Sequence, residues 1–182
     1  GNEEAWRQLE LAEASGDTSR LVHACFMGSV AFSSDGEYNA AHELAARARA
    51  EAHKTMSPTD LASAAVAEAF ASRDDSDALD AFVRANEIAC TAGNRWMSAF
   101  ARTEASGLLI ARGEIDQGCA GLAEMIALWY RAGEWSQHWH TLSRCVIASD
   151  RIANLELATA VLGPIGTLAL PAPVRGPLIR CI

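Results

Sequence analysis

The segment Gly36-Glu37-Tyr38-Asn39-Ala40-Ala41-His42-Glu43-Leu44-Ala45-Ala46-Arg47-Ala48 decides the fold of this chain. It begins with a glycine break, and the small residues Ala41, Ala45 and Ala48 follow at spacings of four and three. Residues at these spacings form one stripe along a helix, and small side chains let a neighbouring helix approach closely. The segment therefore predicts a helix that packs tightly against other helices.

The same kind of stripe occurs five times, and its copies begin 36, 37, 40 and 40 residues apart. The other copies are Ala5, Leu9 and Ala12; Ala78, Phe82 and Ala85; Gly118, Leu122 and Met125; and Ala158, Leu162 and Ile165. A period in this range is typical of stacked helical hairpins, in which no single unit buries its apolar face alone. We therefore predict an all-α fold of antiparallel helical hairpins, stacked as a right-handed solenoid.

Turn signals set the expected helix boundaries. Glycine can supply the left-handed residue that ends a helix, and such breaks occur at Gly16, Gly36, Gly93, Gly113 and Gly133. Ser57-x-x-Asp60, with Pro58 in the first turn, resembles a capping box, and the aspartates of Arg73-Asp74-Asp75 can cap the helix that follows. We predict nine helices, near 2–15, 18–34, 37–54, 58–72, 75–92, 95–112, 114–131, 134–151 and 154–163, and no sheet.

Both ends of the chain fall inside the predicted repeat pattern. The first helix has the stripe of a hairpin's second helix, and the segment after Pro173 begins another helix. We expect one repeat domain over 1–163, excised from a longer protein, and an irregular tail over 164–182 that starts a truncated helix.

Composition and charge narrow the classes of function. The chain has 182 residues, half of them hydrophobic, and a formal net charge of −8, with no basic run. Because an acidic surface repels phosphate backbones, we expect no direct binding of nucleic acid by this segment. No apolar run has the length of a membrane span, and the acidic amino end is unlike a signal peptide. We expect a cytoplasmic protein that does not enter the membrane.

The five cysteines are widely spaced, whereas disulfide frameworks and zinc sites need closer pairs. They are Cys25, Cys90, Cys119, Cys145 and Cys181. We predict buried free thiols in a reducing cytoplasm.

Two stripes near the carboxyl end are candidate binding features. Trp135, Trp139, Leu142 and Val146 follow helical spacing, which is typical of a core stripe, although an aromatic wall facing a groove is the alternative. Gln137, His140 and Arg144 form a second stripe, and Arg102 and Glu104 occupy a comparable place one hairpin earlier. This second stripe is either an ordinary solvated face or part of a concave binding surface. The groove candidates are Arg102, Trp135, Gln137, His140 and Arg144.

Neither a metal site nor a catalytic site is expected. His138 and His140 point in nearly opposite directions on a helix, and the zinc-protease-like start His42-Glu43 lacks a histidine at position 46. The chain contains no phosphate-binding glycine loop and no serine nucleophile elbow. We expect a non-enzymatic segment with no catalytic residue, no metal and no cofactor of its own.

Two resemblances follow from these residues. Gly36-Glu37-Tyr38-Asn39-Ala40-Ala41 and Gly113-Glu114-Ile115-Asp116-Gln117-Gly118 resemble the inter-helix turn of tetratricopeptide repeats. The run from Trp129 to Leu142, with its Ala132-Gly133-Glu134-Trp135-Ser136-Gln137-His138-Trp139 core, resembles a segment near the end of the helical-repeat region of large bacterial LuxR-type regulators. The family pattern continues through Ala158-Thr159-Ala160-Val161-Leu162-Gly163, and Pro164 departs from it.

The second resemblance implies a function. Regulators of that family couple a signalling ATPase module to helical repeats, and some contain an adenylate-cyclase-like domain. The resemblance implies a regulatory segment whose partners are the other domains of the same regulator and a protein or small-molecule inducer. ATP would bind a domain upstream, and DNA would be contacted through a domain outside this segment. The alternatives are a self-contained adaptor that binds a peptide or partner protein, and a dimerisation domain.

Overall fold

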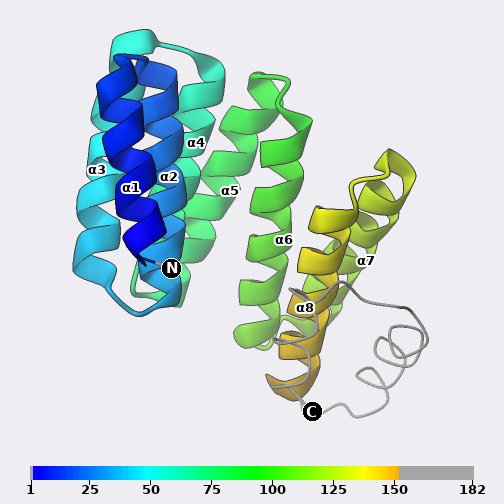
Figure 1. Ribbon diagram of the computed structural model, residues 1–182. Helices are drawn as coiled ribbons and strands as arrows, with labels where there is room; N and C mark the ends of the chain where they lie inside the picture. The colour runs from blue at the N-terminus through cyan, green and yellow to red at the C-terminus, as the bar shows by residue number, and fades with distance from the viewer. Residues whose placement is uncertain (1, 152–182) are drawn as a thin grey trace. The chain divides into compact units, whose positions relative to one another are not determined.

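The chain folds into α-helices joined by short turns (Figure 1). The computed structural model describes the backbone of residues 2–151 and the side chains of residues 3–145. Within 2–151 there are eight helices and no strand, so the predicted all-α class is confirmed. The helices are α1 (Asn2–Ser15), α2 (Thr18–Ser34), α3 (Tyr38–Thr55), α4 (Pro58–Ala71), α5 (Asp75–Thr91), α6 (Arg95–Ala111), α7 (Ile115–Ala132) and α8 (Trp135–Arg151). The ninth helix predicted at 154–163, and the tail at 164–182, lie outside the described residues.

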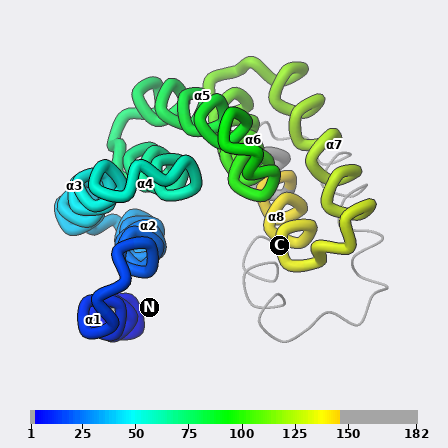
Figure 2. Tube along the Cα trace, turned by 90° about the horizontal axis from the view of Figure 1, so that it is seen from above, coloured from blue at the N-terminus to red at the C-terminus, as the bar shows by residue number. Residues whose placement is uncertain are grey.

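The helices belong to two compact units, and the boundary falls within α6. The first unit runs to Ala101 and contains α1 to α5 together with the start of α6. The second unit begins at Arg102 and contains α7, α8 and the remainder of α6. Seen from above in the first unit, α2, α3 and α4 form a group in which each helix packs against the other two (Figure 2). The right-handed winding of the hairpins stays a prediction.

The repeated stripe is the buried face of the odd-numbered helices. Ala41, Ala45 and Ala48 of α3 are at most 1% exposed. The stripes of α5 and α7 are fully buried, and in α1 only Ala5 remains partly exposed. A Cβ on Gly118 of α7 would lie 2.7 Å from the backbone oxygen of Ser106 on α6. The stripe is therefore buried as its spacing predicts, and Gly118 marks a close approach of α7 to the backbone of α6. The copy at 158–165 lies outside the described residues.

Aromatic rings fill the centre of the first unit. The ring of Phe100 lies 5.8 Å from that of Phe70 and 6.3 Å from that of Phe26, and Phe70 meets Phe82 edge to face at 5.1 Å. These rings come from α6, α4, α2 and α5, so one aromatic group joins helices of three hairpins. Each edge-to-face pair of this kind stabilises the fold by about 0.5–1.5 kcal/mol beyond the stabilisation from burying its apolar surface.

The predicted turn chemistry is present, with one correction at Asp60. Glycines 16, 36, 93, 113 and 133 all have positive φ, and Asp74 caps α5 by accepting from the amides of Ser76 and Asp77. Ser57 caps α4 by accepting from the amide of Asp60 at 3.4 Å. The Asp60 carboxylate does not close a reciprocal capping box, because it accepts hydrogen bonds from Ser19 and Thr55 instead.

The prediction of buried cysteines is correct for two of the thiols in the described region and wrong for one. Cys25 and Cys145 are buried, Cys119 is partly buried, and Cys90 is exposed. These four are free thiols, and Cys181 lies outside the described residues. Cys90 lies outside the set of buried residues of α5, near the end of that helix, and its sulfur lies 3.3 Å from the Ser98 hydroxyl. Across the described part of the chain, no helix combines the length and apolarity that a membrane crossing needs.

Candidate functional site

Glu104 contacts two of the predicted groove residues, His140 and Arg144, in the second unit. Its carboxylate is 7% exposed and faces two residues of α8. Arg144 approaches with Nη2 2.6 Å from Oε2 and Nε 3.1 Å from Oε1, and His140 places Nε2 2.6 Å from Oε1. Because an ionised carboxylate only accepts hydrogen bonds, Nε2 of His140 is the atom that holds the proton. We call Glu104, His140 and Arg144 the Glu104 cluster.

The electrostatics of the Glu104 cluster favour the ionised carboxylate. Burial alone would raise the pKa of Glu104, but the hydrogen bond from His140 and the charge of Arg144 outweigh it and hold that pKa below its ordinary value. The cluster therefore joins α6 to α8 through a charged contact. His140 and Arg144 therefore form neither an ordinary solvated face nor an open row of donors, because both contact Glu104.

Arg102, one turn before Ser106 on α6, points to a different partner. It pairs with Glu124 of α7, and this hydrogen bond, together with the positive charge, lowers the pKa of the Glu124 carboxyl. Both side chains of this pair are more than one third exposed. Arg102 therefore lies on the α6–α7 contact, apart from His140 and Arg144.

Trp135 and Gln137 occupy the start of α8. Trp135 is 55% exposed, which corrects its expected place in a core stripe, and its ring meets that of Tyr130 edge to face at 5.9 Å. Trp135 is the first residue of α8, directly after the turn at Gly133, and its ring also contacts that of His138. Trp139 and Leu142 are partly buried, and Val146 lies outside the described side chains. Gln137 is partly buried, and its buried Oε1 accepts no hydrogen bond from a described residue. The five predicted residues therefore form three separate groups.

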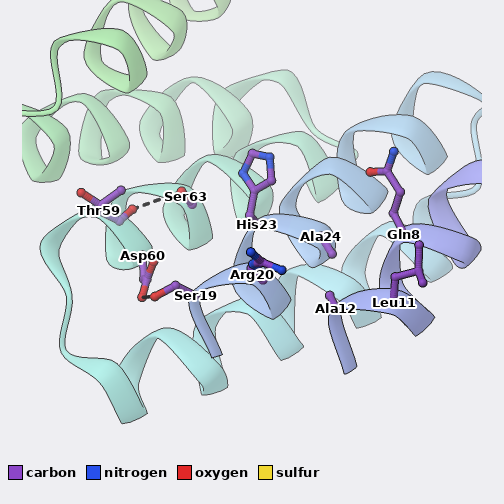
Figure 3. Close-up of a pocket in the computed structure, with 10 residues that line it drawn as sticks. All are labelled: Gln8, Leu11, Ala12, Ser19, Arg20, His23, Ala24, Thr59, Asp60 and Ser63. Carbon is purple, nitrogen blue, oxygen red and sulfur yellow. Dashed lines mark hydrogen bonds between the residues drawn. The ribbon is translucent and has the colours of Figure 1, made fainter. Parts of the chain in front are cut away.

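The first unit contains a pocket of about 530 Å³ that the sequence did not indicate. We call it the α1/α2/α4 pocket, after the helices that line it (Figure 3). Each helix contributes side chains from successive turns of one face. These residues are Gln8, Leu11 and Ala12 from α1; Ser19, Arg20, His23 and Ala24 from α2; and Thr59, Asp60 and Ser63 from α4.

Asp60 is the buried charged group of this pocket. It is 5% exposed, and its Oδ2 accepts hydrogen bonds from the hydroxyls of Ser19 and Thr55, both at 2.8 Å. In Figure 3, Asp60 and Ser19 are joined by a dashed line, while Gln8 and Leu11 of α1 lie at the other side of the view. Among residues 3–145, no arginine, lysine or histidine forms an ion pair with Asp60. The pocket and the Asp60 carboxylate together form a candidate small-molecule site in the first unit.

Only part of this site is visible in a local sequence pattern. Ser57-x-x-Asp60 identified a helix start, and the acid at its fourth position was assigned to capping. Ser19 is 41 residues away from Asp60, so no local pattern relates them. The hydrogen bond between Ser19 and Asp60 is seen only in the folded protein, where α2 packs against α4.

Metal-binding geometry is absent from the described part of the chain, where no three His, Cys, Asp or Glu residues form a group that could hold an ion. Comparison with known proteins adds no family: no protein-family model, no curated protein and no solved structure matches this chain. The Glu104 cluster and the α1/α2/α4 pocket are therefore the features of the structure that bear on function.

Proposed function

We propose that this chain is a non-catalytic sensor segment of a bacterial ATP-dependent transcription regulator of the LuxR type, and that an inducer binds its helical hairpins. The observation that supports an inducer site is the α1/α2/α4 pocket. Its volume of about 530 Å³ falls within the range of about 300–1,000 Å³ that is usual for small-molecule sites. Three helices from neighbouring hairpins line it, so a ligand there would contact more than one repeat.

A ligand in such a pocket can act on the arrangement of the hairpins. In repeat stacks each unit contacts mainly its neighbours, so their relative packing is adjustable. A ligand shifts that packing only by binding one arrangement more tightly than another. In this proposal, the ligand-bound arrangement alters the contact between this segment and the ATPase domain of the regulator.

The test is a thermal-shift screen of the 182-residue chain with equal panels of small metabolites and peptides. A ligand at 100 times its Kd stabilises the folded state by about 2.7 kcal/mol, which is a measurable shift. Leu11 lines the pocket and is 63% exposed, so Leu11→Trp should fill the pocket without disturbing the core. We expect a metabolite to stabilise the chain, Leu11→Trp to abolish that effect, and the same substitution to reduce inducer response in the intact regulator.

A peptide-binding adaptor is the second candidate, and one observation favours it. Tyr130 and Trp135 are 65% and 55% exposed and meet edge to face at the α7–α8 turn, and exposed aromatic residues often anchor partner proteins. Stabilisation by peptides alone, lost in Trp135→Ala and retained in Leu11→Trp, would replace the sensor proposal with the adaptor. A dimer in light scattering that neither panel alters would favour a dimerisation domain.

A further inference from the structure

We propose that the α1/α2/α4 pocket binds a small organic amine, whose ammonium group pairs with the Asp60 carboxylate. This inference rests on the proposed sensor function and names the class of ligand. It depends on one arrangement: a buried carboxylate without a cationic partner among the described residues, placed in the wall of a pocket.

Asp60 has no cationic partner among residues 3–145. Buried charged groups in proteins are almost always paired or coordinated, because burial removes the water that stabilises them. Glu104, the other buried acid of the described region, has both a histidine and an arginine against it. Asp60 has two hydroxyl donors, both on Oδ2, while Oδ1 accepts no hydrogen bond from another described residue. A ligand ammonium would donate to Oδ1 and bring the opposite charge in one contact.

Asp60 also has a structural role, which has to be separated from binding. It lies in the first turn of α4, where acids are favoured by the helix dipole, and it joins α4 to Ser19 of α2. That role accounts for Oδ2, while Oδ1 is not among the buried atoms that lack a partner and is open to water or to a ligand in the pocket. A purely structural aspartate would bind no amine, so the experiment distinguishes the two roles.

The rest of the pocket suits an amine with an apolar body. Leu11, Ala12 and Ala24 supply apolar surface across from Asp60. Arg20 also lines the pocket, but its side chain is 73% exposed and its Nε lies 3.6 Å from Asp17, so its charge is largely screened by water. The surrounding field favours cations, because residues 1–101 contain 16 of the 23 acidic and eight of the 15 basic side chains. The whole net charge of −8 therefore lies in this unit.

The test uses the full chain and two matched pairs of probes: phenethylamine with 2-phenylethanol, and cadaverine with 1,5-pentanediol. Affinities are measured by NMR titration of the 15N-labelled chain. In the wild type we expect each amine to bind at least about tenfold more tightly than its alcohol, with shift changes at pocket residues of α1, α2 and α4. Asp60→Asn keeps an oxygen acceptor for Ser19 and Thr55 and should reduce the amine preference to less than about twofold.

Three further variants keep the test decisive if Asp60→Asn does not fold. Leu11→Arg places a positive charge at the exposed rim and should weaken both amines several-fold, whereas Leu11→Glu should not weaken them. Asp80→Asn removes an exposed acid that does not line the pocket and should leave both affinities unchanged.

Each result decides the proposal. If neither amine binds at 10 mM, or if amine and alcohol bind equally, Asp60 is structural only and the proposal is overturned. If another class of metabolite binds and Leu11→Trp abolishes it, the sensor function stands and only the amine is wrong. If no metabolite binds and the Leu11→Trp regulator responds normally, both proposals fail.

Discussion

The guanidinium of Arg144 on α8 donates to both carboxylate oxygens of Glu104 on α6, at 2.6 and 3.1 Å, although 40 residues separate them in sequence. Two parallel N–H to oxygen contacts of this kind are stronger and more directional than a single one. The contact is also largely buried, since the Glu104 side chain is 7% exposed. The Glu104 cluster is therefore a structural link of the second unit as well as a predicted binding surface.

Glu104→Gln should destabilise the second unit. The substitution keeps the size of the side chain and removes the charge, which leaves Arg144 partly buried without its counter-charge. Losing a hydrogen-bonded charge partner of this kind costs about 2 kcal/mol. The measurement is urea unfolding followed by circular dichroism, with hydrogen exchange of α6 and α8 to locate the loss.

Glu124→Gln is the matched control. It makes the same chemical change at the pair with Arg102, where both side chains are more than one third exposed. Exposed pairs contribute little because water screens them. We expect an unfolding midpoint close to that of the wild type, and an equal loss in the two variants would mean that burial does not strengthen the Glu104 cluster.

The stability of the second unit should fall at acid pH because of Glu104. Folding holds the pKa of this carboxyl below its ordinary value of 4.5. The stabilisation is therefore fully present above that value and is lost as the pH falls through the lower, folded-state pKa. Unfolding free energies between pH 7 and pH 3 should decline more steeply in the wild type than in Glu104→Gln. Parallel pH profiles of the two proteins would exclude this linkage.

The contact between Glu104 and Arg144 shows which features the sequence could predict and which it could not. The helices and their buried stripes were predictable because they depend on spacings of three and four residues and on glycine or aspartate turns. Arg144 could be placed on the correct face of its helix, but its partner across 40 residues could not be found in a local pattern. For the same reason, Asp60 was assigned a capping role, and its contact with Ser19 was missed.

Trp135 shows a different limit of the sequence. Its spacing with Trp139 and Leu142 is typical of a core stripe, yet it is 55% exposed at the first turn of α8. Periodicity gives the direction of a side chain from its helix, but it does not tell how far the neighbouring helix extends. Residues at helix ends are therefore the ones whose burial is hardest to predict.

The four described thiols should react with iodoacetamide in an order set by burial. Burial raises the pKa of both Cys25 and Cys145 from 9.0 to about 11. At pH 8 this change lowers the thiolate fraction about 100-fold, and the thiolate is the reactive form. Exposed Cys90 should be alkylated first and Cys25 and Cys145 last, as followed by peptide mass spectrometry on a Cys181→Ser background. Equally rapid labelling of Cys25 and Cys90 in the native protein would contradict the burial of Cys25.

Gly118→Ala and Gly107→Ala should change stability in opposite directions. Both glycines lie in helices of the second unit, where alanine has the better helix propensity by about 1 kcal/mol. A Cβ at Gly107 meets no atom within 4 Å, so Gly107→Ala should stabilise the protein by up to that amount. At Gly118 the Cβ would lie 2.7 Å from the Ser106 backbone oxygen and closer still to the Ile110 side chain. Because α6 and α7 would have to separate, we expect Gly118→Ala to lose about 1–3 kcal/mol in urea unfolding. Stabilisation by both substitutions would show that the small residue of the stripe is not needed for close packing.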